Sequence, residues 1–195
     1  MTAKKESLLR LVVVLTAIAL VAGLALTGVY ALTKEPIETA QAAKKLEALN
    51  LVLPGFKGEI KDITTKDADG EEILVHLAVN PDGSLFGAGV ETYTKKAFAG
   101  RFDLMVGFDT TGTILNTEVI KAGETPGLGD KINKDKSDFA LQFSNRNPKD
   151  FKLVVKKDGG DVDAITAATI SSRAYCDAVQ RAYDVFMKVK EDYHE

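Results

Sequence analysis

The stretch LVVVLTAIALVAGLALTGVYALT, from Leu11 to Thr33, contains no charged residue in a chain of 195 residues. As an α-helix it would be roughly 35 Å long, at about 1.5 Å per residue. That length exceeds the roughly 30 Å of hydrocarbon in a bilayer. A helix can cross alone because it satisfies its own backbone hydrogen bonds. The stretch therefore predicts a single transmembrane helix over residues 11–33.

The residues that flank this run predict its orientation. Lys4, Lys5 and Arg10 precede it, whereas Lys34, Glu35 and the acidic stretch around Glu38 follow it. Basic residues in short flanking segments favour the cytoplasmic side of a membrane. We therefore expect residues 1–10 to form a cytoplasmic N-terminus. Residues 34–195 should form an extracytoplasmic domain, held at the cell (inner) membrane by this single span.

A cleaved signal peptide is an alternative interpretation of the same run. Val29-Tyr30-Ala31 loosely resembles a cleavage site, and a basic start is common to both kinds of segment. The run is about twice as long as the apolar region of a typical signal peptide, which favours an anchor. A helix in a soluble core is disfavoured because every face of the segment is apolar.

A helix of a different kind is predicted directly after the anchor. Pro36 is expected to prevent the anchor helix from running on. From Ile37 to Asn50 the pattern is that of an amphipathic helix. Its predicted apolar stripe consists of Ala40, Ala43, Leu46 and Leu49.

The remainder of the chain alternates between strand-like segments and turns. The predicted strands are Glu59–Thr65, Glu72–Val79, Leu85–Thr94, Gly100–Asp109, Thr113–Ala122 and Phe151–Lys156. Turn sequences at Asp69-Gly70, Pro81-Asp82-Gly83 and Thr111-Gly112 separate several of them. Closely spaced strands indicate antiparallel pairing.

Short helical potential runs from Lys131 to Asn147, and a longer helix is predicted from about Ile170 to the C-terminus. The expected fold class is α+β: a transmembrane helix, a mainly antiparallel sheet and a C-terminal helix.

Composition excludes several classes of function. The net charge is −3, which gives no electrostatic basis for nucleic-acid binding. Cys176 is the only cysteine, so no internal disulfide can form, and we expect it to be a small buried residue on the C-terminal helix. The only histidines are His76, expected to be structural, and His194. We therefore predict no metal site and no catalytic residue.

Two stretches have the composition of a ligand site. The first, Gly123-Glu124-Thr125-Pro126-Gly127-Leu128-Gly129-Asp130, follows a predicted strand. Its glycines and proline predict a tight backbone with few side chains, which a flat ligand can approach closely. An ordinary surface turn is the alternative. The stretch is neither a Walker loop nor a Rossmann fingerprint, because the required endings and glycine spacing are absent.

The second stretch, from Asp161 to Ser172, lies at the entrance to the C-terminal helix. Its hydroxylated residues are typical of a helix N-cap. The same geometry also favours a phosphate, because the first N–H groups of a helix have no partner and the helix dipole is positive there. From this geometry we expect Ser171 and Ser172 to be neighbours of a phosphate.

Together the two stretches resemble the flavinylated FMN-binding domains that occur in two kinds of subunit. These are the G subunit of Rnf-type electron transport complexes and the C subunit of sodium-pumping NADH:quinone reductases. That family combines a Glu-Thr-Pro-Gly-Leu-Gly loop with a downstream acidic residue and a Ser/Thr-Gly-Ala-Thr motif. This chain has Glu124–Gly129 and then Asp163-Ala164-Ile165-Thr166-Ala167-Ala168-Thr169, behind one anchor. The resemblance covers essentially the whole chain. The length of the chain favours the Rnf protein over the quinone reductase protein, which is generally longer.

The resemblance implies that FMN is attached covalently, through its phosphate, to Thr169. A separate flavin transferase would make the ester from FAD, reading Asp163 and Thr166. Residues Thr125 to Gly129 would approach the isoalloxazine ring. The predicted cofactor-binding residues are Thr169, Thr166, Ala167, Ala168, Ser171, Ser172, Glu124, Thr125, Gly127, Leu128 and Gly129.

Two departures from the family pattern concern this site. Ala167 replaces the usual glycine, which would cost around 1 kcal/mol if a positive φ is required there. Lys121-Ala122-Gly123 stand where the family often has a histidine.

The implied function is electron relay within an Rnf complex that couples electron transfer between ferredoxin and NAD to movement of Na⁺ or H⁺. Its implied partners are the other membrane subunits and the flavin transferase. The chain would be part of an ion-translocating oxidoreductase and not catalytic alone, and its anchor lacks the charge expected of an ion path. The alternatives are the quinone reductase protein and a flavin-free membrane-anchored binding or assembly module, in which Thr169 only caps a helix.

Overall fold

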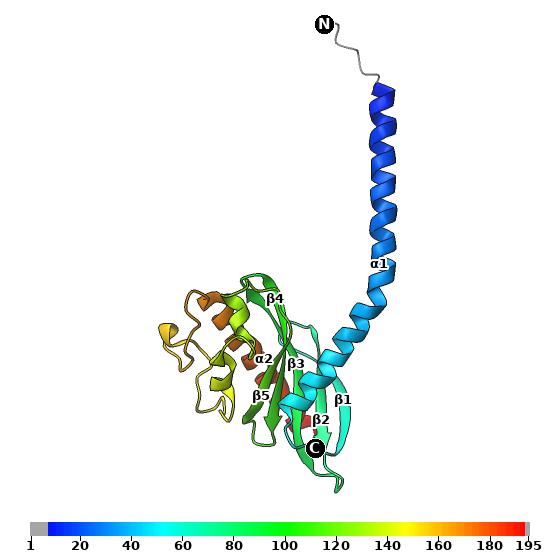
Figure 1. Cartoon of the computed structure of the whole chain (residues 1–195). Coiled ribbons are helices and arrows are strands. Elements are labelled where there is room, and N and C mark those ends of the chain that lie inside the picture. The colour runs from blue at the N-terminus through cyan, green and yellow to red at the C-terminus, as the bar shows by residue number, and fades with distance from the viewer. Residues whose placement is uncertain (1–7, 194–195) are drawn as a thin grey trace. The chain divides into compact units, whose positions relative to one another are not determined.

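The computed structural model describes residues 8–193 of the chain (Figure 1). The chain divides into two compact units, Met1–Ala43 and Lys44–Glu195. Lys4 and Lys5 of the predicted cytoplasmic N-terminus lie outside the described residues, as does His194.

Helix α1 (Leu8–Val52) contains the apolar run and is long and apolar enough to cross a membrane. Pro36 lies inside it, so the prediction that this proline ends the anchor helix is wrong. Proline removes one backbone hydrogen bond, and the helix continues because Ala, Glu, Lys and Leu in the following turns have high helix propensity.

The second unit is built on a five-stranded sheet in which every neighbouring pair is antiparallel. The strand order is β1-β2-β3-β4-β5, a simple meander. The strands are β1 (Glu59–Lys66), β2 (Glu72–Val79), β3 (Leu85–Ala97), β4 (Gly100–Asp109) and β5 (Ile114–Lys121). The predicted antiparallel sheet is confirmed, with turns at Gly70, Gly83 and Gly112.

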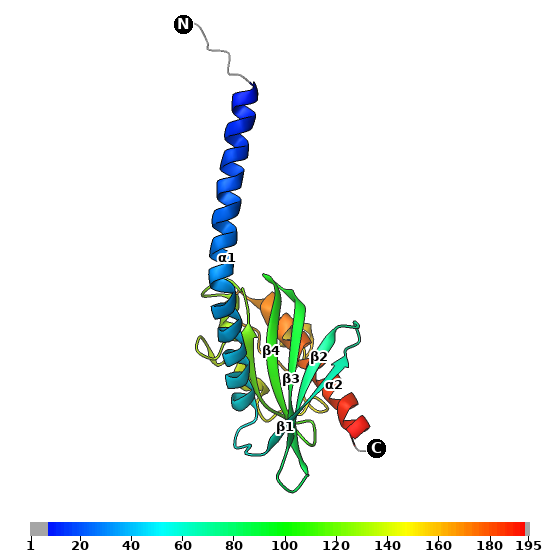
Figure 2. The same ribbon diagram turned by 90° about the vertical axis from the view of Figure 1, so that its right-hand side faces the viewer.

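Helix α2 (Thr169–Tyr193) covers one face of this sheet and confirms the predicted C-terminal helix (Figure 2). Ala174, Ala178 and Ala182 are fully buried, and small side chains of this kind let the helix approach the strands closely. Phe186 stacks on Phe108 of β4 with a centroid distance of 5.1 Å. The hydroxyl of Thr92 on β3 donates to the carbonyl of Ala178 at 3.0 Å. These contacts fix the position of α2 on the sheet.

The last turns of α1 pack on the opposite face of the sheet. Ala48, Leu49 and Val52 form a second apolar cluster with Ala78 and Met105 among others. The approach depends on Gly107 of β4, because a Cβ at that position would collide with the carbonyl of Val52.

The predicted apolar stripe of this helix is largely wrong. Leu49 is buried, but Ala40, Ala43 and Leu46 are exposed. The stripe fails because burial in this helix begins only at Ala48.

Between β5 and α2 the chain forms three short 3₁₀ helices, η1 (Gly129–Ile132), η2 (Asp138–Phe143) and η3 (Lys156–Asp158). The predicted strand Phe151–Lys156 does not form, and Val155 makes only an isolated bridge to Val162. Leu153 and Val155 enter the core from an irregular segment. Alternating burial therefore occurs there without sheet pairing, because the hydrogen bonds close a local loop with Asp161 and Val162.

His76 on β2 anchors a polar network on the face of the sheet covered by α1. Its Nδ1 lies 2.6 Å from Asp62, its Nε2 lies 3.3 Å from Glu91, and Lys45 of α1 also binds Glu91. Burial opposes the protonated ring, but the two carboxylates outweigh it and raise the pKa of His76. The expected structural role of this histidine fits these contacts.

We expect His76→Gln to lower the free energy of unfolding by about 1–2 kcal/mol at pH 6. Hydrogen bonds to charged groups contribute about 1.5–3 kcal/mol, and solvent around the exposed carboxylate of Asp62 reduces this contribution. A raised folded-state pKa means that the contribution is fully present below the unfolded value of about 6.5 and is lost as pH rises through the folded value. Denaturation at pH 6 and pH 9 checks this. An equal difference between wild type and variant at both pH values would contradict it.

Candidate functional site

The start of α2 has an unusual cap. The first intrahelical bond runs from the N–H of Ser172 to the carbonyl of Ala168, so Ala168 is the N-cap residue. Alanine has no side-chain oxygen and is among the poorest N-cap residues. The N–H groups of Thr169, Ile170 and Ser171 have no intrahelical acceptor because of their position. The helix therefore begins with donors that a ligand can use.

Thr169 is half-buried at this helix start and lines a pocket. No hydrogen bond among the described residues occupies its hydroxyl. Its neighbour Ser172 is different, because its hydroxyl accepts from the N–H of Ile165 and donates to the carbonyl of Ala168. Ser172 thus closes the turn before the helix, while the hydroxyl of Thr169 is available.

The turn itself depends on Ala167, which has a φ of 62°. This left-handed conformation places a Cβ too close to the backbone and costs roughly 1–2 kcal/mol for a residue other than glycine. The positive φ considered for this position from the sequence is therefore present.

The loop from Glu124 to Gly129 forms a compact turn beside this helix start. The N–H groups of Leu128 and Asp130 both donate to the carbonyl of Thr125, at 3.1 and 3.3 Å. Gly127 adopts a φ of 77°, which glycine tolerates without strain. The loop directs its backbone and the side chain of Leu128 toward the start of α2.

The structure brings the two predicted stretches together around one pocket of about 320 Å³. Glu124, Thr125, Leu128 and Gly129 line it from the loop, and Ala167 to Ser171 line it from the helix start. Glu124 and Ser171 are buried beneath it, and Ser171 donates its hydroxyl to Glu124. Two stretches separated along the chain thus form one site.

Phe98 is the pocket residue that sequence reasoning missed. It lies in the β3–β4 hairpin turn, and its side chain is 67% exposed although it is aromatic. Leu128 and Ile170 are also exposed, at 42% and 48%. An aromatic residue in a hairpin turn next to Ala-Gly was the available signal, since such a residue has no core to enter.

Not every predicted site residue faces this pocket. Thr166 lines a neighbouring depression of about 420 Å³ with Asp163. The carboxylate of Asp163 is exposed and binds Lys156 at 2.7 Å. Gln142 holds the backbone of Asp163 at two points, since it accepts from the N–H at 2.7 Å and donates to the carbonyl at 3.1 Å. The Asp163–Thr166 segment is therefore presented on a face of its own.

Two aromatic residues of the sheet and the cysteine of α2 do not line this pocket. Phe86 packs against Phe56 with a centroid distance of 5.3 Å, and the hydroxyl of Tyr93 donates to Asp67. Cys176 is buried, and burial raises the pKa of its thiol to about 12. A thiol with such a pKa is not a nucleophile near neutral pH.

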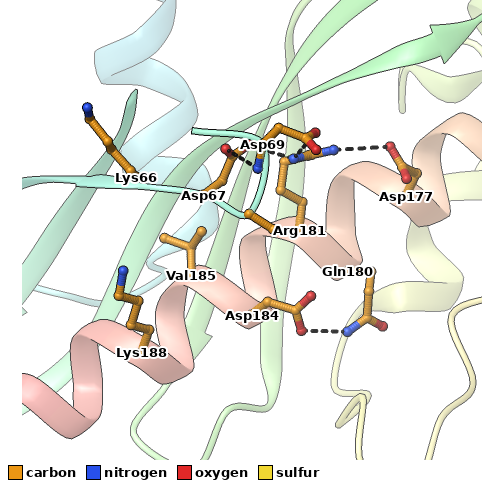
Figure 3. Close-up of a pocket in the computed structure, with 10 residues that line it drawn as sticks. Lys66, Asp67, Asp69, Asp177, Gln180, Arg181, Asp184, Val185 and Lys188 are labelled. Atoms are coloured by element: carbon orange, nitrogen blue, oxygen red, sulfur yellow. Dashed lines mark hydrogen bonds and ion pairs between the residues drawn. The ribbon is translucent and has the colours of Figure 1, made fainter. Parts of the chain in front are cut away.

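A further depression, of about 410 Å³, lies between the β1–β2 hairpin and α2 (Figure 3). Its centre is Arg181, which lies 2.5 Å from Asp67 and 2.8 Å from Asp69. Burial works against the charged form of Asp67, but hydrogen bonds from Tyr93 and Arg181 outweigh it and lower the pKa of Asp67. Because Arg181 is already paired with carboxylates of the hairpin, the cluster fastens the hairpin to α2 and is not our candidate site.

The pocket at the start of α2 fits a ligand with an anionic group and a flat apolar body. Unpaired N–H groups and a helix dipole favour a phosphate at Thr169. Phe98, Leu128 and Ile170 supply apolar surface for a ring system. No described residue of the pocket carries a positive charge, so backbone N–H groups and hydroxyls are the donors that the pocket offers to an anion.

The chain matches two family models: an FMN-binding domain over residues 98–184 and an RnfG N-terminal region over residues 1–52. The first match begins at Phe98 and contains both stretches of the pocket.

Several relatives named as the G subunit of an ion-translocating oxidoreductase complex match most of the chain. That of Aliivibrio fischeri is 34% identical over 193 residues, covering 93% of this chain and 89% of the relative. That of Haemophilus influenzae is 34% identical over 172 residues, covering 85% and 83%. Among solved structures, NqrC of Shewanella oneidensis is similar with a TM-score of 0.49 and 18% identity, covering 66% of this chain and 69% of that one.

We expect Ala167→Gly to raise the free energy of unfolding by about 1 kcal/mol, because glycine adopts a positive φ without a Cβ penalty. Ala164→Gly is the matched control, since Ala164 is exposed in the same segment and has no positive φ. It should leave the free energy of unfolding unchanged or lower it. Urea denaturation of the three proteins checks this, and a destabilised Ala167→Gly protein would contradict it.

We expect Arg181→Ala to lower the free energy of unfolding by about 3 kcal/mol, because it leaves the carboxylate of Asp67, which is 2% exposed, buried without its cation. Arg173→Ala is the control on the same helix. It breaks a solvent-exposed pair with Asp158, which should contribute little to the free energy of unfolding. Equal losses for the two variants, measured by denaturation, would show that burial of the pair does not matter.

Proposed function

The chain belongs to the family formed by the G subunits of ion-translocating oxidoreductase complexes, and we propose that it carries its FMN covalently, esterified through the phosphate to Thr169. Family membership and the FMN-binding domain make it an electron-relay subunit of an Rnf complex. Its N-terminal apolar helix and this family support a membrane location. We propose the covalent attachment of FMN, the orientation of the chain in the membrane and the coupling of electron transfer to ion movement.

The observation that carries the proposal is the hydroxyl of Thr169, which makes no hydrogen bond among the described residues and lies at a helix start capped by alanine. A phosphate ester at this oxygen would lie beside the unpaired N–H groups of Ile170 and Ser171. Each hydrogen bond to a charged group contributes about 1.5–3 kcal/mol. A serine or threonine N-cap would compete for these donors, and Ala168 cannot. Thr169 is the first residue of α2 and Ala168 is the N-cap residue, which disfavours the alternative in which Thr169 only caps the helix.

The rest of the pocket suits the flavin ring. Phe98, Leu128 and Ile170 would contact an apolar ring, and the close backbone of Thr125 to Gly129 would lie at its edge. When bound, FMN supplies the redox chemistry, and the protein sets its position and electrostatic surroundings. Attachment through the phosphate leaves the ring free for electron exchange.

Maturation requires a second protein in this proposal. A flavin transferase that uses FAD as donor would recognise Asp163 and Thr166, as the family resemblance implies. Both side chains are exposed on the depression next to the pocket. The transferase would thus bind the Asp163–Thr166 face while Thr169 receives the phosphate.

The anchor sets where the relay operates. We place residues 1–10 in the cytoplasm, residues 11–33 in the membrane and residues 34–195 outside the cytoplasm, because basic residues precede the apolar run. Covalent attachment then prevents loss of the cofactor outside the cytoplasm. The remaining membrane subunits of the complex would exchange electrons with the flavin.

The complex would act as a translocase that couples electron transfer between ferredoxin and NAD to movement of Na⁺ or H⁺. The apolar run of this chain contains no charged residue and offers no ion path.

The test is mass spectrometry of the tryptic peptide Asp158–Arg173 from protein made together with a flavin transferase and exported. We expect the added mass of an esterified FMN, with fragmentation assigning it to Thr169. Thr169→Ala should lose it completely, because no hydroxyl remains to form the ester. In-gel fluorescence of the denatured protein gives an independent readout.

Thr64→Ala is the matched control, an exposed threonine on β1 remote from the pocket, and it should keep full fluorescence. A fluorescent Thr169→Ala protein, or flavin assigned to Thr166, Ser171 or Ser172, would overturn the attachment site. Wild-type protein of unmodified mass would overturn covalent attachment altogether.

A further inference from the structure

Glu124 is a buried carboxylate that makes two contacts in the pocket. Its side chain is 7% exposed beneath the pocket. One oxygen accepts a hydrogen bond from the N–H of Ala99 at 2.9 Å, and the other accepts from the hydroxyl of Ser171. These donors come from the β3–β4 hairpin turn and from the first turn of α2. One side chain thus joins three segments that are separate along the chain.

We propose that Glu124 is the positioning residue of the flavin site: a clamp that holds the hairpin turn carrying Phe98 and the helix start carrying Thr169 at a fixed separation. This inference rests on the proposed function of the same pocket. Glu124 itself touches both neighbours through charge-assisted hydrogen bonds, which are roughly twice as strong as neutral ones. The pocket is therefore built before any ligand arrives.

Gly129 supports this assignment. A Cβ at that position would collide with a carboxylate oxygen of Glu124 and with the hydroxyl of Ser171. Gly129 is buried and its φ is not positive, so space and not backbone conformation requires glycine there. The loop thus folds tightly over the Glu124–Ser171 contact and shields it from water.

The charge of Glu124 gives the clamp a second consequence. Among the residues that line the pocket, it is the only one with a carboxyl or a basic side chain. A carboxylate in a sheltered site interacts more strongly with nearby charge than one in water. Reduction of a flavin adds negative charge to its ring, so the carboxylate opposes reduction. A residue that served only to hold the fold could be replaced without changing the flavin's midpoint potential.

Glu124→Gln separates the clamp made by Glu124 from the effect of its charge on the flavin. The glutamine oxygen can still accept from Ala99, and its amide can donate to the hydroxyl of Ser171, so the clamp keeps its shape while the charge is lost. Glu124→Ala removes the clamp as well as the charge. Glu72→Gln is the matched control, because Glu72 is an exposed carboxylate on β2.

The first measurement is a double-mutant cycle on the full-length chain in detergent, made without a flavin transferase. It compares wild type, Glu124→Ala, Ser171→Ala and the double variant. We expect the two substitutions to be non-additive by about tenfold in the unfolding equilibrium constant, since they break one hydrogen bond to a charged group. Additive effects would overturn the clamp.

The second measurement uses the flavinylated chain. Glu124→Gln should retain the flavin and shift its midpoint potential to a more positive value, whereas Glu72→Gln should leave it unchanged. An unshifted potential in Glu124→Gln would overturn the electrostatic effect of Glu124 on the flavin, while the double-mutant cycle decides the clamp. If Glu124→Ala does not fold, Ser171→Ala must still destabilise the chain and Glu124→Gln must still shift the potential.

Failure of the proposed function is distinguishable from failure of this inference. If the Asp158–Arg173 peptide carries no flavin, covalent attachment is wrong, and the cycle on the unmodified chain still decides whether Glu124 clamps the pocket. If the peptide is flavinylated but the cycle is additive, attachment stands and the clamp is wrong.

Discussion

The burial of one face of α2 against the antiparallel sheet is the constraint on which the site depends. Alanines on the helix and phenylalanines on both elements bring the helix onto β3 and β4 at close range. Because the core fixes the helix along its length, its first turn has a single position relative to the loop after β5. A helix start defined in this way can present backbone donors, whereas a frayed end could not.

Several features around this helix start are energetically unfavourable. Ala168 is a poor N-cap, Ala167 has a left-handed backbone, and Glu124 is buried without a cation among the described residues of the pocket. Each feature is unfavourable by itself. They occur within one pocket, and together they leave donors and a hydroxyl available to a phosphate. Strain and poor capping of this kind commonly mark functional sites.

Two polar networks away from the pocket keep the scaffold rigid. Arg181 fastens the β1–β2 hairpin to one side of α2, and His76 joins the central strands to the end of α1 through Glu91 and Lys45. Neither network contributes a side chain to the pocket. Both networks can therefore be substituted without removing a side chain from the pocket.

The sequence by itself determined the elements with local causes: the apolar run, the three hairpin turns, the C-terminal helix and the two stretches that form the pocket. Periodicity and turn chemistry act over a few residues, so a single sequence carries them. The tertiary structure decided the rest. It placed Phe98 at the pocket, joined Glu124 to Ala99 and Ser171, and turned the expected strand at Phe151–Lys156 into an irregular segment. These outcomes depend on which distant segments meet, and that is set by the packing of the whole core.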